Sequence, residues 1–322
     1  MALHILEERS PAWHATRLNY VGGSEIAALW GVQPDYGQSA FTLHMVKSRR
    51  IPAPDVDDSP GSRIWFGIHL EPVIAAMAAE LYKWDIEKGG YYTDDTTPGM
   101  AASLDFVIKQ PGPAERELGF TGPGALQIKN TAWLQWAQKW TNDQPPEFII
   151  LQLQHEIACA GFSWGVICVL VDGNQLPIYR YPARPRVIEG IREKVADFWA
   201  AVHAGKPPQT DASDSTAEAL KALYPSVPSA VALDMNFNNR FPDLCVQFIL
   251  ARENKRASEE HYDLAKNEIE SLLEGATWAE SEGFKVHVAV VKESLSRAPK
   301  PGEMIGGRKS SRRLAVSEKL RK

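Results

Sequence analysis

The chain has 322 residues, of which 44% are hydrophobic and 23% are charged, and its formal net charge at pH 7 is −5. This composition excludes a disordered chain and fits one or two globular domains with a sizeable core. The three cysteines, Cys159, Cys168 and Cys245, have neither the spacing of zinc ligands nor an even count, so we expect free thiols in a reducing compartment and no disulfide framework.

The start of the chain does not resemble an export signal. Residues 1–17 contain no basic region that leads into a long apolar run, and no apolar stretch is long enough to cross a bilayer. We therefore expect no signal peptide, no membrane span and no membrane partner. A cytoplasmic location follows as an expectation.

Hydrophobic periodicity predicts helices and strands in alternation up to residue 205. This order favours an α/β fold with a central mixed β-sheet flanked by helices. Helical patterns cover 22–31, 39–50, 63–84, 145–161 and 184–205, and strand patterns cover 91–95, 100–109, 124–130 and two segments within 163–183.

A polar, proline-rich stretch at 206–230 marks a domain boundary. We therefore expect a core over residues 1–210, followed by an extension over 211–298. The extension should hold a helical hairpin, with 245–275 as its long arm, and a pair of strands.

Residues 299–322 form a basic tail, with eight Lys and Arg side chains against two Glu. Because the rest of the chain is acidic, the tail is the most concentrated source of phosphate contacts outside a cleft. Gly306 and Gly307 favour a mobile arm. A solubilising, disordered or subunit-docked end is the alternative.

The strand pattern at 124–130 places two polar side chains on one face. Leu126 and Ile128 alternate with Gln127 and Lys129, so an amide and an ammonium point away from the apolar packing. If the strand that contains Asp105 pairs with this one, all three polar groups face one cleft. That layout is typical of a metal-dependent nuclease, in which carboxylates hold Mg²⁺ and a lysine assists the reaction. The alternative is that Asp105 ends a strand and Lys129 is a solvated tip.

Glu71 is a second candidate metal ligand. It lies on a stripe with Ile64, Ile68 and Ala75 at helical spacing, and an unpaired carboxylate on an apolar stripe is costly to bury. A bound metal would remove that cost. The alternative is that Glu71 caps a turn that begins at Pro72.

Five segments of the sequence together resemble a known family. The segments AWHATRLNYVGGSEIAALWG, WFGIHLEPVIAAMAAE, MAASLDFVI, LQIKN and LQLQHEIACAG are similar, in this order, to motifs of the lambda exonuclease or YqaJ-like viral recombinase family. The resemblance covers about residues 10 to 205. It implies a PD-(D/E)XK, restriction-endonuclease-like core.

The resemblance also implies roles for individual residues. Glu71, Asp105, position 127 and the Ile128 carbonyl would surround the metals, and Lys129 would assist catalysis. Arg17 and Ser24 match positions that hold the 5′-terminal phosphate, and Gln152 matches a residue that supports them. Ile64 and Trp65 match an apolar wedge that parts the end of the duplex. Without the resemblance, Ser24 reads as a plain helix N-cap and Arg17 as part of a surface ion pair.

The implied activity is that of a Mg²⁺-dependent 5′-to-3′ exonuclease of double-stranded DNA, with Mn²⁺ as a substitute. Such enzymes form homotrimeric rings, act on 5′-phosphorylated ends and pass the single strand to a phage annealing protein in the bacterial host. One departure affects this expectation: the family pattern has Glu at position 127, and this chain has Gln127. With one negative charge fewer, metal binding and hydrolysis should be weakened or lost. The alternatives are a PD-(D/E)XK endonuclease or RecB-like repair nuclease, and a non-catalytic module that binds DNA ends.

Overall fold

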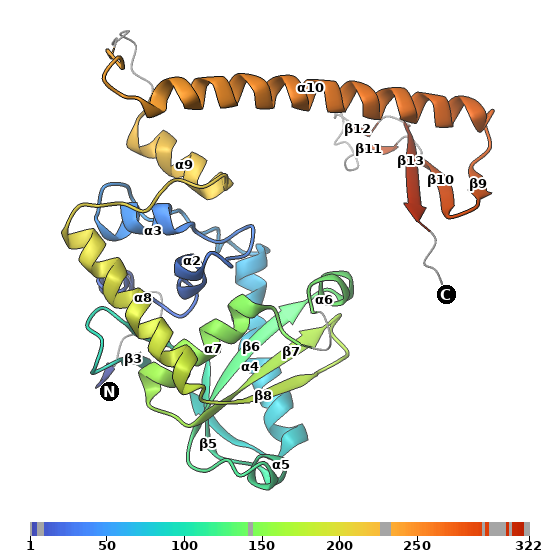
Figure 1. The fold of residues 1–322 in the computed structure, drawn as a ribbon. Helices are drawn as coiled ribbons and strands as arrows, with labels where there is room; N and C mark the ends of the chain where they lie inside the picture. The colour runs from blue at the N-terminus through green and yellow to red at the C-terminus, as the bar shows by residue number, and fades with distance from the viewer. Residues whose placement is uncertain are drawn as a thin grey trace, which may run out of the picture. The chain divides into compact units, whose positions relative to one another are not determined.

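The computed structural model describes residues 2–4, 10–140, 144–225, 233–291, 294–295, 307–308 and 311–318. The chain forms two compact units, Met1–Pro228 and Ser229–Lys322 (Figure 1). The boundaries after residues 210 and 298 stay predictions, and helix α9 (Asp214–Leu223) belongs to the first unit.

A mixed five-stranded sheet forms the centre of the first unit, in the order β2-β5-β6-β7-β8. Strands β6 and β7 are parallel, and the other neighbours are antiparallel. The expectation of a central mixed sheet is therefore confirmed. The strands are β2 (Asp85–Lys88), β5 (Phe106–Gln110), β6 (Gly124–Thr131), β7 (Trp164–Val171) and β8 (Ile178–Pro182).

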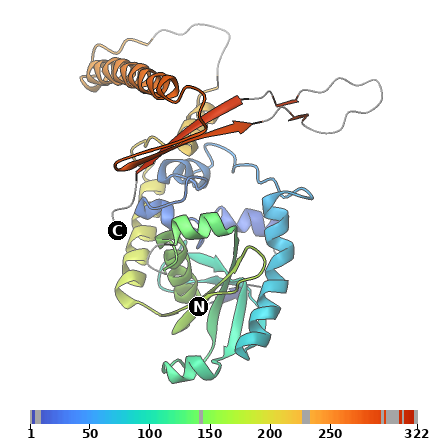
Figure 2. The ribbon, with the colours of Figure 1, turned by 90° about the vertical axis from the view of Figure 1, so that its right-hand side faces the viewer.

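Helices cover both faces of this sheet (Figure 2). Helix α4 (Arg63–Tyr82) lies on one face, where its Ala75 packs in one cluster with Leu126 and Ile128 of β6. Helix α7 (Glu147–Ala160) packs on the other face, and α8 (Pro185–His203) packs against α7 on the same side. The predicted alternation in β6 is confirmed, because its apolar residues at 126 and 128 face α4.

The pattern at 100–109 is not one strand, contrary to our expectation. Strand β4 (Ala101–Ser103) pairs with β3 (Tyr91–Thr93) in a separate sheet that also contains β1 (Ala2–His4), and β5 starts at Phe106. The chain changes sheets where Leu104 crosses Gly89. A Cβ atom on Gly89 would lie 2.1 Å from the Leu104 carbonyl oxygen, so this crossing requires glycine. Asp105 therefore occupies a bend between two strands.

Smaller helices complete the first unit. Helix α9 is joined to α3 by a 2.7 Å hydrogen bond between the hydroxyls of Thr216 and Ser39. The other small helices are α1 (Pro11–Arg17), α2 (Ile26–Trp30), α3 (Ala40–Lys47), α5 (Pro113–Glu117) and α6 (Trp133–Lys139).

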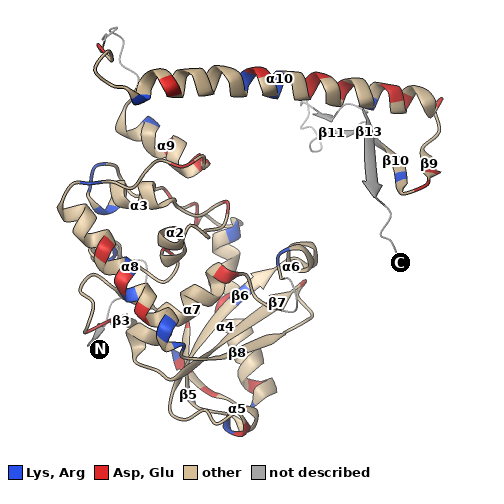
Figure 3. Cartoon of the chain, in the orientation of Figure 1, with Lys and Arg blue, Asp and Glu red and all other residues tan. Residues whose placement is uncertain are grey.

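The described part of the second unit contains one long helix, α10 (Arg240–Leu272), while the shorter helix α9 of the predicted extension belongs to the first unit, so the helical hairpin over 211–298 stays a prediction. Charges of both signs follow one another along α10 (Figure 3), with i,i+4 ion pairs such as Arg256 with Glu260. The strands of this unit follow α10 in the sequence. One sheet has the order β13-β10-β9 and consists of β9 (Trp278–Ser281), β10 (Phe284–Val291) and β13 (Ser311–Glu318). A separate pair is formed by β11 (Ser294–Leu295) and β12 (Gly307–Arg308).

Strand β13 lies within the predicted basic tail. Residues 311–318 pair with β10 along eight residue pairs, so the mobile-arm interpretation is wrong for this part of the tail. Its remaining residues, except 307–308, lie outside the described residues.

Among the described residues, helix α4 is long and apolar enough to cross a membrane by length and composition alone. This is weak evidence, because the core helix of a soluble protein passes the same test. Here α4 packs Ile74, Ala75 and Ala78 against the central sheet. The absence of a membrane partner and the cytoplasmic location stay predictions.

Candidate functional site

Asp105 and strand β6 meet at one end of the central sheet. The antiparallel register pairs Phe106 with Leu126, so Asp105 comes opposite Gln127. The Asp105 carboxylate accepts a hydrogen bond of 2.8 Å from the backbone N–H of Ile128. This bond fixes the carboxylate beside the backbone of the predicted metal-binding strand segment.

Gln127 is fully buried and faces helix α7. Its amide Nε2 lies 3.5 Å from Oε1 of Glu156, which is itself only 1% exposed. The other oxygens of this pair, Oε1 of Gln127 and Oε2 of Glu156, are buried and have no hydrogen-bond partner. Buried polar atoms normally have hydrogen-bond partners, so these two oxygens are candidates for binding a ligand.

The polar contacts continue from Glu156 along α7. Glu156 Oε1 accepts a 2.8 Å hydrogen bond from the Gln152 side chain, and Gln152 in turn accepts one of 3.4 Å from Lys129 Nζ. Burial and, to a smaller extent, the charge of Asp105 raise the pKa of Glu156 to about 8. Asp105, Gln127, Lys129 and Gln152 therefore lie around one buried acid, although only the first three were expected to share a cleft.

Glu156 was not among the site residues predicted from the sequence. The available signal was an acidic residue one helical turn after Gln152, in a largely apolar segment whose other polar residues are Gln154 and His155. That signal alone does not separate a ligand from a buried structural acid.

Glu71 differs from its expectation in two ways. Its carboxylate forms a 2.7 Å ion pair with Lys88, and its side chain is 22% exposed, so it is neither unpaired nor deeply buried. The turn-capping alternative is also wrong, because α4 starts after Ser62 and runs through Pro72. The negative charge of Glu71 does act on Glu156, and this places it at the margin of the same site.

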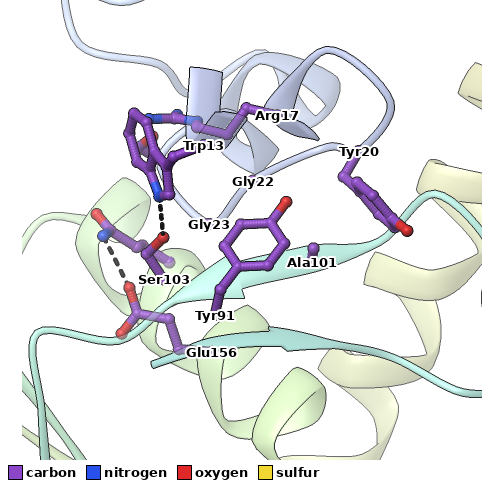
Figure 4. Close-up of a pocket in the computed structure, with 11 residues that line it drawn as sticks. Trp13, Arg17, Tyr20, Gly22, Gly23, Tyr91, Ala101, Ser103 and Glu156 are labelled. Carbon is purple, nitrogen blue, oxygen red and sulfur yellow. Dashed lines mark hydrogen bonds between the residues drawn. The ribbon is translucent and has the colours of Figure 1, made fainter. Parts of the chain in front are cut away.

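Arg17 lines a cavity of about 150 Å³ next to the buried acid (Figure 4). Its guanidinium lies 4.5 Å from the centroid of the Trp13 ring, and the Trp13 indole donates a 3.1 Å hydrogen bond to Ser103. Gln152 and Glu156 line the same cavity. A stacked guanidinium in a cavity that opens beside the sheet is well placed to receive an anion.

The acidic neighbour of Arg17 is already neutralised. Glu25 lies 3.9 Å from Arg17 but is bound more closely by Lys47, at 2.8 Å. Burial alone would raise the pKa of Glu25, but Lys47 and Arg17 hold it below its usual value. Because Lys47 satisfies Glu25, the Arg17 guanidinium keeps positive charge for a ligand.

Ser24 is exposed in a turn and lines the Arg17 cavity. It is not a helix N-cap, since α2 starts at Ile26 with Glu25 at its N-cap position, and it does not lie in the first turn of that helix. The preceding Gly23 packs against the site. A Cβ atom there would come within 3.3 Å of Gln152 and 3.4 Å of Glu156.

A second cavity, of about 240 Å³, shares Ser24 and Gln152 with the first. Lys129, Arg63 and Lys139 line it, so its charged groups are cationic. The predicted wedge residues directly follow Arg63 in the sequence. Ile64 is exposed, whereas the Trp65 ring lies tilted against His69, with 4.0 Å between the ring centroids.

In the parts of the chain that the structure describes, no three His, Cys, Asp or Glu side chains form a ready metal cage. Mg²⁺ does not require one, because it keeps several waters and uses one or two carboxylates. The Asp105 carboxylate, together with the two unpartnered oxygens of Gln127 and Glu156, fits such a site.

A mixed sheet flanked by helices, with these polar groups on neighbouring strands, is the α/β arrangement that the PD-(D/E)XK resemblance predicts. Residues 12–163, just under half of the chain, match the family model of the YqaJ-like viral recombinase domain, which supports the resemblance over this part of the sequence.

One curated relative, the uncharacterized protein YqaJ of Bacillus subtilis (strain 168), is 22% identical over 83% of this chain and 79% of its own length. Two crystal structures of LHK-Exo, an alkaline exonuclease from Laribacter hongkongensis, one of them in complex with dAMP, are also similar. Each gives a TM-score of 0.48, with 20% and 19% identity, over 61% of this chain and 94% of theirs. Similarity at this level does not establish a shared activity.

Proposed function

We propose that this chain is a Mg²⁺-dependent exonuclease, with Mn²⁺ as a substitute, that degrades one strand of duplex DNA from its 5′-phosphorylated end. The product is a 3′ single-stranded overhang for phage-type recombination. The observation that carries the proposal is the convergence of Asp105, Gln127 and Lys129 beside the cavity that Arg17 lines.

The residues that would hold the metal are Asp105, Gln127 through its amide oxygen, the Ile128 carbonyl and Glu71. When bound, Mg²⁺ would polarise the phosphodiester and lower the pKa of the attacking water. Lys129, which Gln152 orients, would position that water and stabilise the charge that develops on the phosphate. The short hydrogen bond from Ile128 keeps the Asp105 carboxylate in place.

Arg17 and Ser24 would hold the 5′-terminal phosphate. Stacking on Trp13 restricts the guanidinium, so less conformational entropy is lost when it binds. Because Gln152 lines both cavities, it would set the distance between the terminal phosphate and the scissile bond. Ile64 and Trp65, beside the second cavity, would separate the two strands at the end of the duplex.

Assembly into a homotrimeric ring, transfer of the strand to a phage annealing protein and action in the host cytoplasm are further proposals. Exposed apolar side chains on α4, among them Phe66, Val73 and Met77, are available for subunit contacts. The mass of the protein in solution tests the trimer. Co-purification with an annealing protein encoded by the same phage tests the partner.

Digestion of two DNA substrates tests the proposed function. With Mg²⁺, the protein should degrade linear duplex that carries 5′-phosphates and leave a covalently closed circle intact, because the Arg17 cavity requires an end. EDTA should stop the reaction. Cleavage of the circle would instead favour the endonuclease alternative. Binding of linear ends without cleavage at any Mg²⁺ concentration would favour a non-catalytic end-binding module.

A further inference from the structure

The strand position that should supply the second acid holds Gln127, and a buried acid lies directly against it. Glu156 approaches from α7 on the face of the sheet to which Gln127 points, with 3.5 Å between the Gln127 amide nitrogen and Glu156 Oε1. The two residues are 29 positions apart in sequence, and only the packing of α7 on β6 brings them together.

The hydrogen bonds of Glu156 do not account for its burial. One carboxylate oxygen is bonded to Gln152 and Gln127, but Oε2 has no partner, and neither has Oε1 of Gln127. A buried acid that serves only structure is normally paired through both oxygens, because an unsatisfied one costs free energy. Two unpartnered oxygens on touching side chains, opposite the Asp105 carboxylate, indicate a cation between them.

The surroundings hold Glu156 in this position. Gly23 lies so close that an added Cβ atom would come within 3.4 Å of Glu156 Oε1 and 3.5 Å of its Cγ. Figure 4 shows the carboxyl on the wall of the Arg17 cavity, with its bond to the Gln152 side chain. Glu156 therefore stands between the proposed phosphate cavity and the proposed metal site.

We propose that Glu156 is a metal ligand that supplies, from α7, the carboxylate that strand position 127 lacks. The metal is then held by Asp105 and Glu156, with the Gln127 amide oxygen as a neutral ligand. The inference rests on the proposed metal-dependent function and deepens it: the chain is a complete nuclease with a relocated acid, rather than one weakened at position 127.

Metal binding without DNA tests this directly. We would titrate Mn²⁺ into the protein by calorimetry, using wild type, Glu156→Gln, Asp105→Asn and the exchange variant Gln127→Glu/Glu156→Gln. Glu156→Gln should weaken binding at least tenfold. The exchange variant returns a carboxylate to the strand and should recover an affinity within about threefold of wild type. Glu147→Gln, the same change at an exposed position of α7, should bind like wild type.

Each result decides between the claims. If Asp105→Asn weakens binding and Glu156→Gln does not, the relocated acid is wrong and the proposed function stands. If Asp105→Asn binds as tightly as wild type, the metal site of the proposed function is wrong. A folded exchange variant that fails to recover affinity also overturns the inference. Should Glu156→Gln fail to fold, shown by its circular dichroism, the exchange variant alone decides.

Discussion

Changing Asp105 to Asn is expected to lower the rate of DNA cleavage by about 10²- to 10³-fold. The substitution removes a negative charge but keeps an oxygen that can accept the 2.8 Å hydrogen bond from the Ile128 N–H. The fold should therefore remain, while the charge that holds Mg²⁺ is lost. Single-turnover release of labelled nucleotides from prebound duplex measures the effect without a contribution from DNA binding.

Asp85→Asn is the matched control. Asp85 lies on β2 of the same sheet, and its side chain is 67% exposed in a surface ion pair with Lys109. Its replacement should leave the rate unchanged, because an exposed pair of this kind contributes little. If Asp105→Asn retained the wild-type rate, Asp105 would not belong to the reacting site.

Replacing Arg17 with Ala should slow the degradation of 5′-phosphorylated duplex by roughly 10- to 100-fold. A charge-assisted contact to phosphate is worth about 1.5 to 3 kcal/mol, which corresponds to that factor. On duplex with 5′-hydroxyl ends the variant and wild type should differ little, since the contact is absent from both. Initial rates on the two substrates at subsaturating DNA give the comparison.

Arg49→Ala controls for the loss of a surface cation, because Arg49 is exposed and contacts the Asn19 side chain. Arg49→Ala should change the initial rates on phosphorylated and hydroxyl-ended duplex by the same factor. An equal loss for Arg17→Ala on phosphorylated and hydroxyl ends would show that Arg17 serves another purpose, such as packing against Trp13.

Local sequence patterns predicted the sheet that carries the site. Strand β6 could be predicted because apolar and polar side chains alternate along it with a period of two. The apolar side chains are the ones that pack against α4. The polar side, with Gln127 and Lys129, was therefore predicted along with the apolar side. The approach of Asp105 to this side required only that neighbouring strands pair.

Features that depend on distant parts of the chain could not be predicted. The break before β5 arises where Leu104 crosses Gly89, and the partner of Glu71 is Lys88, on a different element. Glu156 was hidden for the same reason: a helical period says which face of α7 is buried but not what that face meets. In the extension, helical periodicity predicted the long arm, where α10 lies, but it does not say which other helix packs beside that arm.

The polarity of degradation tests the central claim most directly. A linear duplex with 5′-phosphates would be labelled at the 5′ end of one strand or, in a second preparation, at the 3′ end of that strand, and digested with Mg²⁺. We expect the 5′ label to be released early as mononucleotide, while the 3′ label stays on a strand that shortens progressively. Early release of the 3′ label, or internal fragments that carry either label, would contradict an exonuclease that starts from the 5′-phosphate.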